Sequence, residues 1–128
     1  MDDEIRLRKA WERLINAQPD MTLVGSLGAA DDLDAAVDET SPDVVVIDLT
    51  MPGTDPIGAV RALAERKPDV KAVFYSGRGE PELMRDAFDA GAWGFIDKLT
   101  LPTDAIESLR RIAAGEVVFP GRPRAPRR

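Results

Sequence analysis

The sequence predicts an α/β fold in which helices cover both faces of a doubly wound parallel sheet. Segments with helical periodicity alternate with short apolar segments along nearly the whole chain, and only a few residues connect them. One apolar segment, Val44 to Ile47, has β-branched side chains throughout, which is typical of a strand buried on both faces. Alternation of this kind favours right-handed crossovers and a parallel sheet. We expect four strands and five helices.

Five segments carry apolar residues at helical spacing, and each has a start signal, a stop signal or both. The clearest start is Asp55-Pro56, an N-cap residue followed by proline at the first helical position. Thr103-Asp104 is the start signal of the last helix. The predicted helices span residues 4–17, 33–39, 56–66, 81–90 and 103–114.

Strand signals fill the intervals between these helices. The β-branched run ends at Asp48, and Met51-Pro52-Gly53 then turns the chain. Ser76-Gly77 ends the next strand, and the last strand delivers Lys98 at its end. The predicted strands span residues 21–26, 44–48, 70–75 and 94–97.

The composition fits one globular domain and narrows the chemistry open to it. The chain has 128 residues, 44% hydrophobic and 31% charged, which is enough to bury a substantial core. Cysteine and histidine are absent, which excludes disulfides, thiolate chemistry and the commonest general base. No apolar run approaches the roughly 20 residues of a membrane span, and no signal peptide opens the chain. We therefore expect a cytoplasmic protein without membrane contact.

The net charge of −6 is distributed unevenly. The last seven residues, RPRAPRR, contain four arginines and no acid, so the remainder has 13 basic against 23 acidic residues, a net charge of −10. A body this acidic is poorly suited to nucleic acid, and we expect it to bind none directly. We assign residues 1–119 to one domain and residues 120–128 to a Pro/Arg-rich tail or linker stub.

Three predicted strands end in chemically distinct groups, namely Asp48, Ser76 and Lys98. The carboxyl ends of parallel strands meet at one edge of a sheet, where open α/β folds place their chemistry. Asp2 and Asp3 precede the first helix and would reach the same edge if a strand preceded them. Clustered carboxylates favour a hard divalent cation such as Mg²⁺. A carboxylate beside that cation can attack phosphorus, while a lysine and a hydroxyl stabilise the phosphoryl oxygens.

These features resemble the receiver domain of two-component response regulators, most closely receivers that precede a LuxR/NarL-type helix-turn-helix output domain. The resemblance covers nearly the whole chain. The matching segments are Asp2-Asp3-Glu4, PDVVVIDLTMPG, FYSG, AGAWGFIDK and residues 109–118. It implies a flavodoxin/CheY-like fold and a signalling role. The domain would take a phosphoryl group from a sensor histidine kinase and catalyse at most its own phosphorylation and dephosphorylation. A second copy of the chain would be a further partner, in a homodimer.

The resemblance also implies a role for each residue that accepts or senses the phosphoryl group. Asp48 is similar to the phosphoacceptor, Ser76 to the switch hydroxyl and Lys98 to its charge partner. Phe95 is similar to an aromatic switch whose inward rotation accompanies activation. The plainer alternatives are a turn residue for Ser76, a surface lysine for Lys98 and a core aromatic for Phe95.

A magnesium site is implied in the same way. Asp3 and Asp48 are similar to the direct ligands, Asp2 to a neighbour that binds through water, and Thr50 to a residue that offers its backbone carbonyl. The plainer alternative for Asp2 and Asp3 is a helix cap or a solvated terminus.

The chain departs from the family pattern in three places. Leu99 stands where a proline usually follows the lysine, and Pro56 where glycine is usual. More importantly, the first central strand, which would precede Asp2 and lie between residues 21–26 and 44–48, is absent. We expect a late start codon to explain this. There are two alternatives. The chain is a fragment without function, or the two flanking strands pair with each other directly or through a second copy of the chain.

Two other functions compete with the phosphoacceptor role. The first is a truncated or pseudo-receiver, which would act as an interaction module without phosphorylation. The absent strand favours this alternative, whereas the presence of Asp48, Ser76 and Lys98 argues against it. A phosphatase that forms an aspartyl phosphate would need a second aspartate two residues after the nucleophile, where Thr50 stands.

Overall fold

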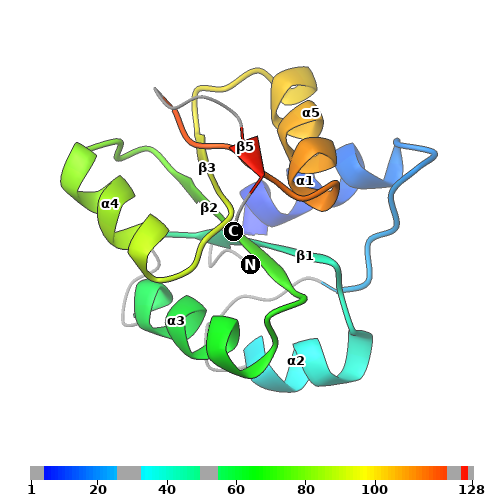
Figure 1. Ribbon diagram of the computed structural model, residues 1–128. Helices are drawn as coiled ribbons and strands as arrows, with labels where there is room; N and C mark the ends of the chain where they lie inside the picture. The colour runs from blue at the N-terminus through cyan, green and yellow to red at the C-terminus, as the bar shows by residue number, and fades with distance from the viewer. Residues whose placement is uncertain (1–4, 26–32, 50–54, 121–124, 127–128) are drawn as a thin grey trace.

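Five helices alternate with the strands of a parallel sheet in the computed structural model (Figure 1), which describes residues 5–25, 33–49, 55–120 and 125–126. The helices are α1 (Ile5–Asn16), α2 (Leu33–Thr40), α3 (Pro56–Arg66), α4 (Pro81–Asp89) and α5 (Pro102–Ala113). The parallel strands are β1 (Val44–Asp48), β2 (Lys71–Ser76) and β3 (Gly94–Asp97). The short strands β4 (Glu116–Val117) and β5 (Ala125–Pro126) form an antiparallel pair. The predicted α/β fold with five helices is confirmed.

The central strand of the sheet is β2, which pairs in parallel with β1 on one side and β3 on the other. The register aligns Asp48 with Tyr75 and Ser76 with Asp97. Two further backbone bonds extend the ladders, from Leu49 N–H to the Tyr75 carbonyl at 3.1 Å and from Lys98 N–H to the Ser76 carbonyl at 2.9 Å. The three strands therefore end together at one edge of the sheet.

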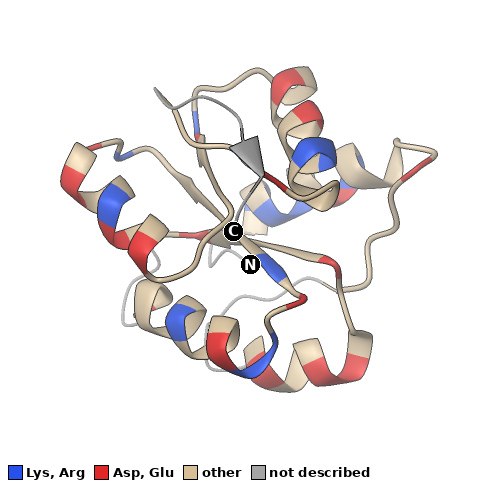
Figure 2. Ribbon diagram, in the orientation of Figure 1, with Lys and Arg blue, Asp and Glu red and all other residues tan. Residues whose placement is uncertain are grey.

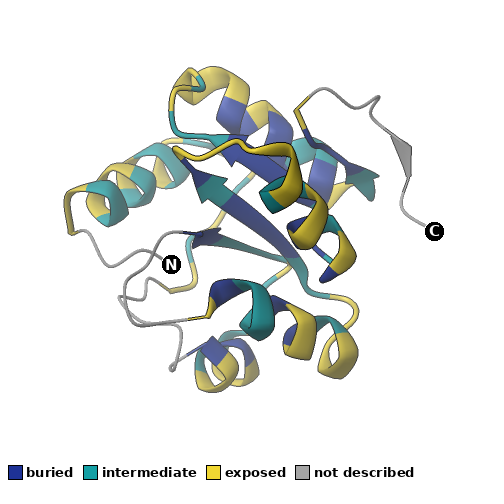
Figure 3. Ribbon diagram, turned by 90° about the vertical axis from the view of Figure 1, so that its left-hand side faces the viewer, coloured by how far each residue is buried: buried dark blue, intermediate teal, exposed yellow. Residues whose placement is uncertain are grey.

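Both faces of the sheet are covered, which explains why its strands lack a polar face. In Figure 1, α1 and α5 lie on one side of the sheet, and α2, α3 and α4 lie on the other. Along β2, Ala72 and Phe74 pack in the core under α2, α3 and α4, whereas Val73 and Tyr75 pack toward α1 and α5. Figure 3 shows the strands largely buried and the outer faces of the helices exposed. This period-two alternation is the geometry of a sheet with two apolar faces.

One predicted strand is wrong. Residues 21–25 form no strand, and the described parallel sheet has three strands instead of the expected four. Thr22, Leu23 and Val24 line a cavity of about 160 Å³ together with Val44, Val45 and Val46 of β1. A strand forms only beside a backbone with which it can pair, and among the described residues no strand pairs with residues 21–25. Direct pairing of the flanking segments is not found among the described residues.

The first helix packs less tightly than the other four. Its predicted inner stripe includes Trp11, Leu14 and Ile15, and all three are half-buried, although no residue of α1 is buried. Trp11 and Ile15 line the cavity beside β1, and Leu14 lines an open groove of about 470 Å³ between α1 and α5. The predicted amphipathic stripe of α1 therefore faces the rest of the fold, beside space that its side chains do not fill.

The helix starts show how local chemistry sets boundaries. Asp55 caps α3 as predicted, because its side chain accepts a hydrogen bond from Gly58 N–H at 3.1 Å. The predicted start of α5 at Thr103-Asp104 is slightly wrong, since the helix begins at Pro102 with Leu101 as N-cap. Proline suits the first helical position, because its fixed φ is already helical and it carries no N–H that would need a partner.

The segment after α5 covers the outer edge of β3. Phe95 N–H donates to the Val118 carbonyl at 3.0 Å, and Val118 N–H donates to the Trp93 carbonyl at 2.9 Å. Phe119 is buried and packs edge-on against Phe88 of α4, with ring centroids 5.6 Å apart. Edge strands without such cover are prone to pair with other chains. The division of the chain at residue 119 stays a prediction.

Charged residues occur on the helices and turns (Figure 2), and ion pairs join some of these elements. Arg66 at the end of α3 bonds Asp34 at 3.0 Å and Asp38 at 2.9 Å, both on α2. Arg110 of α5 bonds Asp20 at 2.8 Å, in the turn after α1. The described helices include none that is long and apolar enough to cross a membrane.

Adding a methyl group at Gly94 should destabilise the fold, because β3 is held closely between α5 and the segment after it. A Cβ at this position would lie 2.5 Å from Ile112 Cδ1 and 3.1 Å from the Val118 carbonyl oxygen. We expect Gly94→Ala to lower the free energy of unfolding by about 1–3 kcal/mol in urea titrations. Gly25→Ala is the matched control, since nothing lies within 4 Å of its added Cβ. Equal stability of the two variants would contradict this packing.

The Arg110–Asp20 contact should make stability depend on pH in acid. The Arg110 guanidinium holds the pKa of Asp20 below its usual value. A carboxylate with a lowered folded-state pKa stabilises the fold above its unfolded pKa and loses that contribution as the pH falls. We expect Asp20→Asn to lower the Tm slightly at pH 7. The Tm difference from the wild type should begin to shrink as the pH falls to about 4, the usual aspartate pKa, and should vanish well below that pH. Asp69→Asn is the control, and a difference that persists in acid would refute the assignment.

Candidate functional site

An ion pair joins the ends of β1 and β3. Lys98 Nζ lies 2.9 Å from Asp48 Oδ2, although 50 residues separate them in the chain. The Asp48 side chain is only 4% exposed and the Lys98 side chain 26%, so the carboxylate is buried while the ammonium reaches it from the rim. The plainer interpretation of Lys98 as a surface lysine does not describe this contact. A buried carboxylate paired with a cation suits reaction with an anionic group.

Ser76 lies at the same edge, at the end of β2. Its side chain is fully buried, and Oγ accepts a hydrogen bond from Arg78 N–H at 2.9 Å. The backbone of Ser76 also receives the N–H of Lys98 at 2.9 Å. The sequence therefore predicted correctly that the three strand ends meet at one edge of the sheet.

The turn after Lys98 contains a hydrogen bond that a proline at position 99 could not make. Because leucine follows Lys98, the Leu99 N–H is available, and it donates to Asp97 Oδ1 at 2.7 Å. Thr100 N–H donates to the Asp97 carbonyl at 3.0 Å. Asp97 thus holds the loop that carries Lys98. Leu99 itself is 91% exposed.

Tyr75 is a neighbour of the ion pair that the sequence interpretation did not single out. Lys98 Nζ lies 5.5 Å from the centroid of the Tyr75 ring. Trp11 of α1 meets the same ring edge-on, with centroids 5.2 Å apart and an interplanar angle of 85°. The sequence shows only that this tyrosine directly precedes the strand-end serine. It does not show on which face of the sheet the tyrosine ring lies, because that depends on the register.

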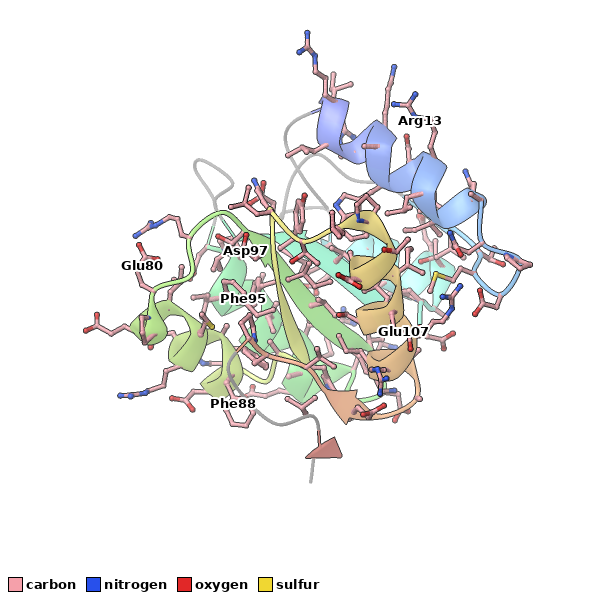
Figure 4. All side chains as sticks on the ribbon, turned by 90° about the horizontal axis from the view of Figure 1, so that it is seen from above. Arg13, Glu80, Phe88, Phe95, Asp97 and Glu107 are labelled. Carbon is pink, nitrogen blue, oxygen red and sulfur yellow. The ribbon has the colours of Figure 1, made fainter. Side chains whose placement is uncertain are left out.

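Phe95 lies on the opposite face of the sheet from Tyr75. It is 2% exposed and belongs to the core under α2, α3 and α4. Its ring centroid is 6.3 Å from that of Phe119, at a tilt of 35°. Figure 4 shows Phe95 within the molecule on β3, Phe88 on α4 and Asp97 at the end of β3. The structure thus describes Phe95 in an inward position; its switch role stays a prediction.

Most of the predicted magnesium ligands lie outside the described residues, namely Asp2, Asp3 and Thr50. Asp48 is the predicted ligand that the structure does describe. In the described part of the chain, no group of three or more carboxylate or other metal-binding side chains gathers. The donor set that the sequence offers consists of carboxylate and carbonyl oxygens, which is the chemistry Mg²⁺ prefers, and one or two carboxylates suffice for that ion.

Comparison with known families identifies the domain. The family model described as the response regulator receiver domain matches residues 1–110. The chain belongs to the response regulator receiver family. The resemblance seen in the motifs is thereby confirmed, and the buried Asp48 and its neighbours belong to a receiver domain of a two-component response regulator.

Its curated relatives include LuxR/NarL-family response regulators. The chain is 35% identical over 118 residues to the uncharacterized transcriptional regulatory protein YxjL of Bacillus subtilis, covering 92% of this chain and 54% of that protein. It is 30% identical over 119 residues to the nitrate/nitrite response regulator NarL of Escherichia coli, covering 93% of this chain and 55% of NarL. The chain therefore spans about half the length of these relatives.

Solved structures show the same CheY-like receiver fold. A LuxR-family two-component response regulator from Aurantimonas sp. SI85-9A1 superposes with a TM-score of 0.86 at 29% identity, covering 91% of this chain and 84% of that one. The isolated receiver domain of RcsB from Salmonella enterica gives a TM-score of 0.84 at 20% identity, covering 94% of this chain and 89% of that one. The receiver fold is thus preserved although the described sheet has three parallel strands.

Removing the ammonium group of Lys98 should destabilise this site, because Asp48 would keep its buried charge and lose a cationic partner. We expect Lys98→Met to lower the free energy of unfolding by about 1–3 kcal/mol. Asp48→Asn combined with Lys98→Met should recover part of this loss, since both charges are then gone. Lys67→Met is the control, because its ion pair with Asp38 is exposed. A double variant weaker than Lys98→Met in urea titrations would contradict the pairing.

Proposed function

We propose that this receiver domain accepts a phosphoryl group on Asp48 from a sensor histidine kinase, in the presence of Mg²⁺. The observation that carries the proposal is the buried Asp48 carboxylate, which Lys98 Nζ contacts at 2.9 Å at the carboxyl edge of a parallel sheet. Membership of the receiver family supports the same reaction.

The transfer proceeds by displacement at phosphorus. A carboxylate oxygen of Asp48 attacks the phosphorus of a phosphohistidine and forms an acyl phosphate. The phosphorus–nitrogen bond breaks, and its electron pair remains on the histidine nitrogen. The Lys98 ammonium group stabilises the negative charge of the equatorial phosphoryl oxygens. The Ser76 hydroxyl, whose oxygen accepts a hydrogen bond from Arg78 N–H, would donate its own hydrogen to a phosphoryl oxygen.

A bound Mg²⁺ would neutralise charge on the phosphoryl oxygens and on the nearby carboxylates. The residues that would hold it are Asp48, Asp3, Asp2 through water, and the Thr50 carbonyl. Only Asp48 among them lies in the described part of the chain, so this ligand set is carried by the resemblance and by its oxygen chemistry.

Phe95 would transmit the change from the site to the surface. It follows Gly94 on β3, three residues before Lys98, and its ring lies in the core beside Phe119. A shift of Ser76 or Lys98 toward a phosphoryl group would alter the packing around this ring. The surface that responds would be formed by β3, α5 and the segment after α5, through which the domain would dimerise or contact an output.

The cellular setting follows from the same proposal. The domain would act in the cytoplasm as a signalling module that catalyses at most its own phosphorylation and dephosphorylation. It would contact neither membrane nor nucleic acid itself. Residues 120–128 would form a Pro/Arg-rich linker stub.

The deciding experiment is incubation with Mg²⁺ and a small phosphodonor such as acetyl phosphate, followed by intact mass spectrometry. We expect the protein to gain the mass of one phosphoryl group and Asp48→Asn to gain none. Asp43→Asn is the matched control, since Asp43 is exposed just before the same strand, and it should be modified like the wild type. Omission of Mg²⁺ should greatly slow the reaction.

A folded wild-type sample that gains no mass would refute the phosphoacceptor role. It would favour the alternative, a pseudo-receiver that binds partners without phosphorylation. A gain that survives in Asp48→Asn would show that another residue is the acceptor.

A further inference from the structure

Three side chains gather on the α1 and α5 side of the sheet, at its carboxyl edge. Asp48 ends β1, Tyr75 pairs with it in register on β2, and Lys98 follows β3. Lys98 Nζ contacts Asp48 at 2.9 Å and lies 5.5 Å from the centroid of the Tyr75 ring. The ammonium group is therefore held between a carboxylate and an aromatic ring.

We propose that Tyr75 is a positioning residue for Lys98, and that Trp11 of α1 holds the Tyr75 ring in place. This inference rests on the proposed function, because Lys98 is the group that would stabilise the transferred phosphoryl oxygens. Tyr75 acts through Lys98 and touches no reacting atom.

The chemistry of lysine explains why a positioning residue is useful here. Its ammonium group is a point charge on a flexible four-carbon chain, which can leave the carboxylate and point into water. The Lys98 side chain is 26% exposed, so solvent is within reach. An aromatic face within about 6 Å attracts the ammonium group electrostatically. The ring therefore holds the cation close to Asp48.

The orientation of the Tyr75 ring depends on α1. Trp11 meets it edge-on at 5.2 Å, an arrangement that aromatic pairs prefer. The two rings also line both the cavity beside β1 and the groove between α1 and α5. Without Trp11, the Tyr75 ring would have open space on that side. A helix without buried residues is thereby connected to the phosphoacceptor through Trp11, Tyr75 and Lys98.

The chain contains its own matched control. Lys71 Nζ lies 5.1 Å from the centroid of the Trp93 ring, a contact of the same kind at the opposite end of β2. The sequence contains only four lysines, at positions 9, 67, 71 and 98. The reactivity of each amine can therefore be followed separately in one experiment.

Competitive acetylation with a limiting amount of acetic anhydride, read by peptide mass spectrometry, tests the proposal without phosphorylation. We expect Tyr75→Leu to raise the labelling rate of Lys98 relative to Lys67 by about two- to fivefold, the Boltzmann factor of a partly exposed cation–π contact. Tyr75→Phe should leave the rate unchanged, because the ring face remains. Trp93→Leu should raise the rate at Lys71 and not at Lys98.

An unchanged Lys98 rate in folded Tyr75→Leu would overturn the proposal, and so would an equal rise in Tyr75→Phe. A rise at all four lysines would mean that Tyr75→Leu has unfolded. Trp11→Leu then carries the test, since α1 has no buried residue to lose. It should raise the rate at Lys98 and leave Lys9, on the same helix, unchanged; no rise at Lys98 would overturn the proposal.

Phosphorylation by acetyl phosphate separates this inference from the proposed function. We expect Tyr75→Leu to slow the modification of Asp48 about two- to fivefold, the same Boltzmann factor, while Tyr75→Phe retains the wild-type rate. Equal rates in all three proteins would refute the positioning role. If the wild type is not modified while the labelling pattern holds, the proposed function fails and the positioning of Lys98 stands.

Discussion

The parallel pairing of β2 with both β1 and β3 is the constraint on which the site depends. It places the ends of three strands at one edge of the sheet, although Asp48 and Lys98 are 50 residues apart in the chain. The Leu49 and Lys98 amides continue the two ladders beyond the strands. The functional side chains are therefore attached to backbone that the sheet itself holds in place.

Burial on both sides of this sheet divides the site into two parts. Asp48 and Lys98 share a face with Tyr75 and α1, while Phe95 packs in the core under α4. The two faces connect the strand ends to different parts of the molecule. The Phe95 ring lies beside Phe119 in the segment after α5, whereas Lys98 lies over the Tyr75 ring, which meets Trp11 of α1.

The first helix and the segment beside it mark the loosely packed part of the domain. α1 has no buried residue, and a cavity of about 160 Å³ lies between β1 and residues 22–25. Interiors are normally packed to the density of organic crystals, so space of this size leaves neighbouring side chains without contacts. The three parallel strands and α2 to α5 nevertheless bury two apolar clusters, one on each face of the sheet.

The sequence by itself determined most of the local elements and the family to which the domain belongs. Helical periodicity located all five helices, the β-branched run before Asp48 marked its strand as buried, and the motifs around Ser76 and Lys98 identified a receiver domain. Only the tertiary structure decided that residues 21–25 do not form a strand, because a strand requires a partner that no local pattern reveals. The place of Tyr75 beside Lys98 was likewise undetermined, since one step of register would move its ring to the other face.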